Sequence, residues 1–293
     1  MATERADAPA CAPVETGVDM GAAMQAAAQR IGRLEARLLL QHLSGLSASA
    51  LVAHPEYPLD AAVAAAYAAL VARRAAGEPM AYLTGRREFY GRDFFVAPGV
   101  LIPRPETELL VELALAKVAG IAAPRILDLG CGSGCIGISL ALERPDARVT
   151  ALDASGEALA IARRNAQALG ARVELLESDW FAALASRCGS ERYHLIVSNP
   201  PYIAEADPHL RQGDLRFEPL CALASGADGL DALRRIAAEA PAHLHPAGWL
   251  LFEHGFDQVG AARELLLAAG YGRIEQQRDL AGIVRVSGGC RPG

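Results

Sequence analysis

A strand, a glycine-rich loop and a helix follow one another at residues 125–140, and this succession constrains the fold more than any other stretch. The apolar run at 125–129 predicts a buried strand. The loop after it consists of Gly130, Cys131, Gly132, Ser133 and Gly134. Glycines let a backbone approach a ligand closely, and the N-terminus of the following helix offers free N–H groups. The stretch therefore predicts an open α/β sheet with its binding site beyond the strand ends.

Two further predicted strands bring side chains to the same edge of the sheet. The strand at 148–152 ends at Asp153, whose carboxylate is placed to accept both hydroxyls of a ribose. The strand at 172–176 is followed by Trp180, against which an adenine could lie. The alternative for Trp180 is that it only fills the core.

The loop fits two kinds of cofactor. Gly132, Gly134 and Gly137 match G-x-G-x-x-G, and Asp153 lies near the offset of about 20 residues expected for a dinucleotide ribose ligand. Asp128, near the end of the first strand, would repel a pyrophosphate but suits the ammonium group of a methionine moiety. We therefore favour S-adenosylmethionine over a nicotinamide cofactor.

A rigid turn follows the fourth predicted strand, at 193–198. Pro200 and Pro201 each fix φ near about −65° and lack an N–H, so the carbonyls around Asn199 and Pro200 have no ladder partners close by. Asn199 adds an amide oxygen, and Tyr202 adds a flat aromatic face. The turn could hold a planar NH₂ group between paired acceptors. The alternative is a proline-rich turn with a cap-forming asparagine.

Composition limits the classes of partner. The chain has 293 residues, enough for two domains, and no apolar run approaches the ~20 residues of a membrane span. Its formal charge of −6 gives no global attraction to a polyanion, so we expect no direct nucleic-acid partner and no membrane. The six cysteines form no C-x-x-C pair, which indicates reduced thiols in a cytoplasm, without a metal site.

The chain divides into four predicted segments. Residues 1–19 form a disordered tail without the features of a secretory signal, and residues 20–81 form a small helical domain. In that domain we expect one or two helices over 20–46, a short one ending at His54, and one capped by Asp60. Residues 82–104 form a β-hairpin linker, and residues 105–293 form the α/β domain, beginning with a helix at Pro105.

The last part of the chain carries a long loop and further regular elements. The segment 203–223 shows little periodicity and is long for a connection, which is typical of lids or binding surfaces. We expect helices at 229–244 and 259–269 and strands at 248–253 and 283–286. Polar side chains near them have no convincing metal-ligand spacing and are interpreted as surface or core groups: Glu253, His254, His243 and His245.

These motifs resemble, in their order, those of the release-factor glutamine methyltransferases, the PrmC or HemK group. The likeness is carried by the stretches 100–108, 128–134, 178–181 and 196–203, and extends through 217–220, 229–231 and 279–282. It implies a bacterial, cytoplasmic enzyme that moves a methyl group from S-adenosylmethionine to N5 of the glutamine in the Gly-Gly-Gln motif of class I release factors. The product is S-adenosylhomocysteine, and we expect a monomer.

The resemblance also implies roles for particular residues. Gly130 to Gly134 would line the methionine end of the cofactor, Asp153 the ribose and Trp180 the adenine. Asn199, Pro200, Pro201 and Tyr202 would hold the glutamine amide, with Asn199 also beside the cofactor. The helical domain would bind the protein substrate. The alanine-rich tail departs from the family pattern, and we expect it to be dispensable for chemistry.

Two other functions remain open at this stage. An adenine-N6 methyltransferase acting on DNA or RNA would use the same acceptors, because adenine also presents an exocyclic NH₂. The acidic chain and the compact helical domain argue against it. A non-catalytic nucleotide-binding module would use the glycine loop alone, with the proline turn as a structural feature.

Overall fold

The computed structural model describes residues 18–185 and 192–293, and the chain divides between Thr84 and Gly85 into two compact units. Nearly all of the predicted tail at 1–19 lies outside the described residues. Asp19 is described, and its carboxylate accepts the Ala22 N–H at 2.6 Å as the cap of the first helix. Asp19 is thus part of the first unit.

The first unit is helical, as predicted. Its helices are α1 (Met20–Ile31), α2 (Arg33–Ser44), α3 (Ala48–Ala53), α4 (Ala61–Ala75) and α5 (Met80–Thr84). Asp60 caps α4 as predicted, because its carboxylate accepts two backbone N–H groups at the start of the helix. The core between the helices is apolar and includes Tyr67, whose hydroxyl donates to the Ala36 carbonyl at 2.9 Å. The sequence pattern did not predict α5, which directly follows Pro79.

The second unit begins with the predicted hairpin. Strands β1 (Arg86–Phe89) and β2 (Arg92–Phe95) pair antiparallel, and Phe89 and Phe94 are fully buried. The remaining helices are α6 (Glu108–Val118), α7 (Cys135–Glu143), α8 (Gly156–Leu169), α9 (Asp231–His243) and α10 (Val259–Ala268). The remaining strands are β3 (Arg125–Leu129), β4 (Arg148–Asp153), β5 (Val173–Glu177), β6 (Tyr193–Ser198), β7 (Leu244–Glu253), β8 (Gly272–Arg278) and β9 (Val284–Cys290).

These seven strands form one sheet in the order β5-β4-β3-β6-β7-β9-β8. The strands from β5 to β7 in this order are parallel, whereas β9 and β8 join antiparallel at the edge. The predicted Rossmann-like α/β sheet with a preceding helical domain is confirmed. The chain moves outward from β3 to β5 and returns to β6 on the other side of β3. A crevice is therefore expected at the carboxyl ends of β3 and β6.

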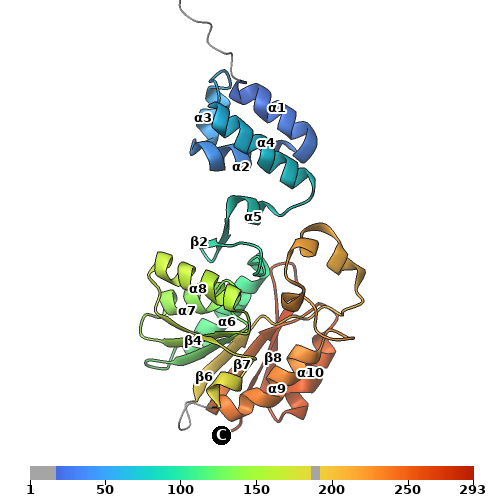
Figure 1. The fold of residues 1–293 in the computed structure, drawn as a ribbon. Helices are drawn as coiled ribbons and strands as arrows, with labels where there is room; N and C mark the ends of the chain where they lie inside the picture. The colour runs from blue at the N-terminus through green and yellow to red at the C-terminus, as the bar shows by residue number, and fades with distance from the viewer. Residues whose placement is uncertain (1–17, 186–191) are drawn as a thin grey trace, which may run out of the picture. The chain divides into compact units, whose positions relative to one another are not determined.

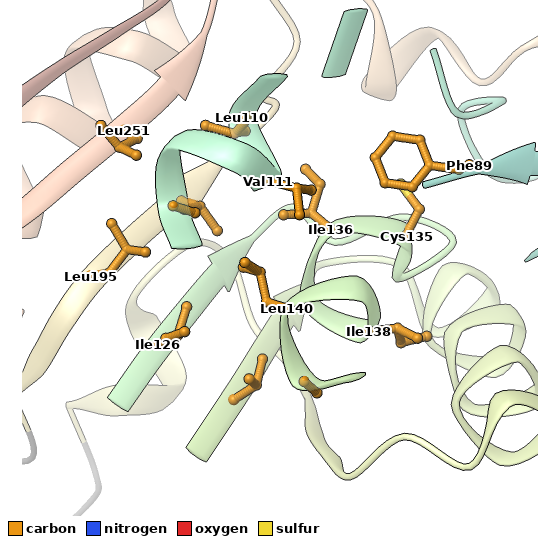
Figure 2. Packing of buried hydrophobic residues seen from close by; sticks show 14 of the residues in the cluster. Phe89, Leu110, Val111, Ile126, Cys135, Ile136, Ile138, Leu140, Leu195 and Leu251 are labelled. Atoms are coloured by element: carbon orange, nitrogen blue, oxygen red, sulfur yellow. The ribbon is translucent and has the colours of Figure 1, made fainter. Parts of the chain in front are cut away.

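Helices cover both faces of the sheet (Figure 1). Side chains alternate between the faces along each strand: Leu195 and Val197 of β6 belong to the cluster with α6 and α7, and Ile196 belongs to the cluster with α9 and α10. Figure 2 shows the first cluster, with Ile126 of β3 and Leu140 of α7 among its members. Burial on both faces holds the central strands, and with them the loops at their ends, in fixed positions.

Some predicted boundaries were wrong. The helix expected at Pro105 starts as a 3₁₀ turn, η1 (Pro105–Thr107), and becomes α-helical only at Glu108. Strand β7 begins at Leu244 rather than at 248, and β9 continues to Cys290. Strand β8 was not predicted because, as the edge strand, it has largely polar and half-exposed side chains, without the alternation that marks a half-buried strand.

Candidate active site

A pocket of about 370 Å³ lies at the carboxyl ends of β3, β4 and β6. The residues predicted from sequence that line it are Gly130, Cys131, Gly132, Ser133, Asp153, Trp180, Asn199 and Pro201. Four other predicted site residues, Asp128, Gly134, Pro200 and Tyr202, are not part of this lining. The linker contributes a further part of the lining, which also includes Thr107: Gly99, Val100, Leu101, Pro103 and Arg104.

The glycine loop is fixed against β4. The Cys131 N–H donates to the Leu152 carbonyl at 2.9 Å, and the Gly132 N–H donates to Asp153 Oδ2 at 2.8 Å. Gly134, at φ +80°, caps α7, and a Cβ there would come within 2.8 Å of Ile138 Cδ1. The positive φ favours glycine here, and a side chain would also have to push the Ile138 methyl group aside.

Asp153, which the sequence predicts as the ribose ligand, lies on the pocket wall. Its Oδ2 accepts the Gly132 N–H, and its Oδ1 accepts the Ser155 N–H at 2.9 Å. Each carboxylate oxygen has a further acceptor position, so both can still receive a hydroxyl. These hydrogen bonds from the backbone therefore orient the carboxylate at the pocket wall and leave an acceptor position free on each oxygen.

Asp128 lies fully buried beneath the loop. Its Oδ2 accepts the Gly137 N–H at 2.9 Å, and its Oδ1 has no hydrogen-bond partner within the described part of the chain. Burial raises the pKa of this carboxyl to about 7, and the neighbouring Asp153 contributes in the same direction. A buried, incompletely paired carboxylate favours a cationic group nearby, which is the chemistry of an ammonium or a sulfonium.

Replacing Asp128 with asparagine should stabilise the protein without cofactor. Because the folded pKa lies above the unfolded one, the carboxyl's contribution to stability is fully present below about pH 4 and is lost as the pH rises towards 7. Asparagine still accepts the Gly137 N–H but does not titrate. The gain in unfolding free energy should therefore grow from pH 5 to 7 and then level off, reaching on the order of 1–3 kcal/mol.

Urea unfolding at several pH values measures this difference. Asp93→Asn is the control, since Asp93 is exposed on the hairpin beside Arg86, and its effect should not grow between pH 5 and 7. A gain for Asp128→Asn that is the same at pH 5 and pH 8 would contradict the assignment of the raised pKa to Asp128.

Trp180 is held by an unusual backbone conformation. Its φ is +49°, which is uncommon for a bulky residue. The Ser178 hydroxyl donates to the Trp180 carbonyl at 2.7 Å and accepts the Ala183 N–H at 2.9 Å, which fixes this turn. A Cβ on Gly130 would lie 4.0 Å from Trp180 Cζ3. The indole thus forms a wall of the pocket beside the glycine loop.

The proline turn is attached to both neighbouring strands. The Ser198 hydroxyl donates to the Leu129 carbonyl at 2.8 Å, which ties β6 to β3 just before Asn199. The Asn199 Nδ2 donates to Thr107 Oγ1 at 3.1 Å. The Tyr202 hydroxyl donates to Glu253 Oε1 at 3.2 Å, and burial, with the adjacent carboxylate, raises the pKa of Tyr202. The phenol therefore stays protonated at neutral pH.

Two residues of this environment had no predicted role. Thr107 donates to Glu253 Oε2 at 2.6 Å, and both side chains are buried. Glu253, interpreted from sequence as a surface or core polar group, is a core group that contacts the predicted turn. It ends β7, the strand that pairs with β6 next to Asn199, and no local sequence signal indicates that pairing.

The long segment 203–223 forms part of the pocket wall. It contains the 3₁₀ turns η3 (Pro208–Arg211), η4 (Gly213–Phe217) and η5 (Leu220–Ala222), and the pocket is lined by Pro219, Cys221 and Ala222. Glu218, in the same segment, is buried. Its carboxylate accepts one hydrogen bond from the Arg104 guanidinium at 2.5 Å and one from the Ile102 N–H at 3.1 Å. This ion pair joins the segment to the linker wall.

Among the described residues, no helix combines the length and the apolar character that a membrane span requires. In the same residues, no three His, Cys, Asp or Glu side chains gather where they could hold a metal ion.

Comparisons with known proteins place this geometry in a family. Residues 105–213 match the family model "Methyltransferase small domain", and residues 21–85 match "PrmC N-terminal domain". A 16S rRNA N2 methyltransferase of T. thermophilus, solved in complex with AdoMet and guanosine, shares the fold. Its TM-score is 0.51 at 20% identity, over 70% of this chain and 49% of that one.

Two curated relatives are much closer. The release factor glutamine methyltransferase of Burkholderia pseudomallei is 56% identical over 272 residues, covering 91% of this chain and 94% of the relative. The enzyme of the same name from Bordetella pertussis is 58% identical over 257 residues, covering 88% and 94%. The resemblance seen in the motifs is thereby confirmed, and the chain belongs to the family of the release factor glutamine methyltransferases.

Proposed function

We propose that this protein transfers a methyl group from S-adenosylmethionine to N5 of the glutamine in the Gly-Gly-Gln motif of class I release factors. The observation that carries the proposal is the acceptor turn at the end of β6, where Asn199 lies on the wall of a pocket that also contains Asp153. The names of the curated relatives support the substrate. Because release factors work in translation, we expect the enzyme in the cytoplasm.

The pocket fits the cofactor in its donor and acceptor groups. Asp153 would accept the ribose hydroxyls, Trp180 would pack against the adenine, and the loop from Gly130 to Ser133 would line the methionine end. The buried carboxylate of Asp128 would attract the positive charge through the loop. When bound, the cofactor supplies an electrophilic methyl group on a sulfonium.

The chain's own residues would act by positioning. The lone pair of an amide nitrogen is delocalised into its carbonyl, so the nitrogen is a weak nucleophile. The Asn199 Oδ1 and the Pro200 carbonyl would accept its two N–H groups and turn the lone pair towards the methyl group. The Tyr202 ring would fix the amide plane. Such orientation supplies on the order of 7–11 kcal/mol in favourable cases, and no general base is required.

The pairing of the linker arginines favours a protein substrate over a polyanion. Arg86 lies 3.8 Å from Asp93, Arg92 bonds Glu143, and Arg104 bonds Glu218. These three cations are thus matched by carboxylates, and the fourth linker arginine, Arg87, donates to the Pro103 carbonyl at 3.2 Å. A nucleic-acid adenine methyltransferase would instead need basic side chains available to phosphates.

Mass spectrometry of a purified release factor tests the proposal. After incubation with enzyme and S-adenosylmethionine, we expect a single added methyl group, located by fragmentation on the Gly-Gly-Gln glutamine. Parallel incubations with duplex DNA and with RNA should show no transfer. Methyl incorporation into a nucleic acid alone would overturn the proposal, and cofactor binding without any transfer would support a non-catalytic module.

A further inference from the structure

A buried chain of hydrogen bonds joins the proposed acceptor to a carboxylate behind it. Asn199 Nδ2 donates to Thr107 Oγ1 at 3.1 Å, and Thr107 Oγ1 donates to Glu253 Oε2 at 2.6 Å. Glu253 Oε1 accepts the Tyr202 hydroxyl at 3.2 Å. Glu253 and Thr107 are each 2% exposed, so water does not compete for the bond between them. The Glu253 carboxylate thus contacts Tyr202 directly and Asn199 through the Thr107 hydroxyl.

The direction of this chain is determined at Glu253. Burial raises the pKa of Glu253, whereas the hydrogen bonds from the Thr107 and Tyr202 hydroxyls oppose this rise and favour the ionised form. In that form the carboxylate only accepts hydrogen bonds, so the single proton of the Thr107 hydroxyl must point to it. The lone pairs of Oγ1 are then left for a donor, and the Asn199 amide can satisfy them only with its Nδ2. Its Oδ1 is consequently turned away from Thr107, which leaves it available to accept a hydrogen bond.

We propose that Glu253 and Thr107 are positioning residues that hold the Asn199 carboxamide with its oxygen towards the substrate amide. The inference rests on the proposed function, since it assumes that Asn199 accepts an N–H of the glutamine. Without an anchor, an asparagine amide can rotate by about 180° at little cost and present NH₂ to NH₂. The anchor is built from one residue of the η1 turn and one at the end of β7.

Glu253→Gln should reverse the direction of the chain. The glutamine oxygen can still accept the Tyr202 hydroxyl, which leaves its NH₂ to donate to Thr107 Oγ1. The Thr107 proton is then free to point to Asn199, whose amide turns its oxygen to meet it. The NH₂ group of Asn199 would then face the NH₂ group of the substrate amide, and two hydrogen-bond donors repel each other. Turnover should fall on the order of 10- to 100-fold, somewhat less than for loss of a direct transition-state contact.

Changes at Thr107 separate this effect from a general loss of packing. Thr107→Val keeps the shape but removes the hydroxyl, so Asn199 loses its anchor without being reversed, and turnover should fall only about 3- to 10-fold. Thr107→Ser keeps the hydroxyl and should restore most of the turnover. In Glu253→Gln/Thr107→Val the reversed chain is cut, so the double variant should be more active than Glu253→Gln alone.

Methyl transfer to a release factor, measured as kcat and KM, tests these expectations. The loss should appear in kcat, while the cofactor Kd from calorimetry changes less than about threefold. Glu264→Gln, at an exposed site on α10, is the control and should leave kcat unchanged. Glu253→Gln with turnover within threefold of wild type, or single effects that simply multiply in the double variant, would overturn the inference.

Two further outcomes are distinguishable. If Glu253→Gln does not fold, as thermal melts would show, the comparison of Thr107→Val with Thr107→Ser decides, and equal turnover of the two contradicts the anchor. If the wild-type enzyme itself transfers no methyl group to a release factor, the proposed function fails, and the inference fails with it.

Discussion

Asn199→Ala is expected to lower kcat for release-factor methylation on the order of 10²–10³-fold, because the variant loses the proposed acceptor for the reacting amide. The cofactor Kd should change less than about threefold, since Asp153, Trp180 and the glycine loop remain in the pocket wall. KM for the release factor should also change little, because we expect the helical domain to contribute to binding of that protein. Single-turnover kinetics and calorimetry measure the two effects separately.

Asn199→Asp is the informative companion. It keeps two acceptor oxygens at the same place but loses the Nδ2 that donates to Thr107. Its kcat should therefore fall between those of the wild type and the alanine variant. An alanine variant as active as the wild type would contradict the role of Asn199. A loss of cofactor affinity as large as the loss of turnover would move that role to cofactor binding.

The residues that the sequence predicted at the pocket could be recognised from local patterns. Asp153 and Asn199 each follow a clear apolar run, and the carboxyl ends of parallel strands meet at one edge of a sheet. The glycine loop was recognisable because Gly130, Gly132 and Gly134 stand between an apolar run and a helix, and all three adopt the positive φ that glycine permits. Local pattern and a general rule of sheet topology were therefore sufficient for these residues.

The contacts that could not be predicted join distant parts of the chain. Thr107 and Glu253 are 146 residues apart, and Ile102 and Glu218 are 116 apart. The strand ending at Glu253 was predicted, but its place beside β6 depends on the sheet order, which no local pattern gives. The 3₁₀ turn that brings Thr107 inwards was likewise predicted only as the start of a helix. Asp128 was predicted at the site but lies beneath it rather than in the pocket wall.

Asp153→Ala is expected to weaken cofactor binding on the order of 10²–10⁴-fold, because two proposed hydrogen bonds from ribose hydroxyls to a carboxylate are lost, each worth about 1.5–3 kcal/mol. The same change also removes the acceptor for the Gly132 and Ser155 N–H groups, so it would loosen the loop as well. The affinity of the alanine variant alone, measured by calorimetry with S-adenosylhomocysteine, therefore cannot separate direct contact from loop geometry.

A 2′-deoxy analogue of S-adenosylhomocysteine separates the two contributions. If the carboxylate contacts the 2′-hydroxyl, the wild type should bind the analogue on the order of tenfold more weakly than the parent ligand, whereas Asp153→Ala should bind both equally. Loosening of the loop affects both ligands alike and cancels in this comparison. Equal discrimination by the two proteins would show that Asp153 acts only on the loop, through the backbone of Gly132 and Ser155, and not on the ribose.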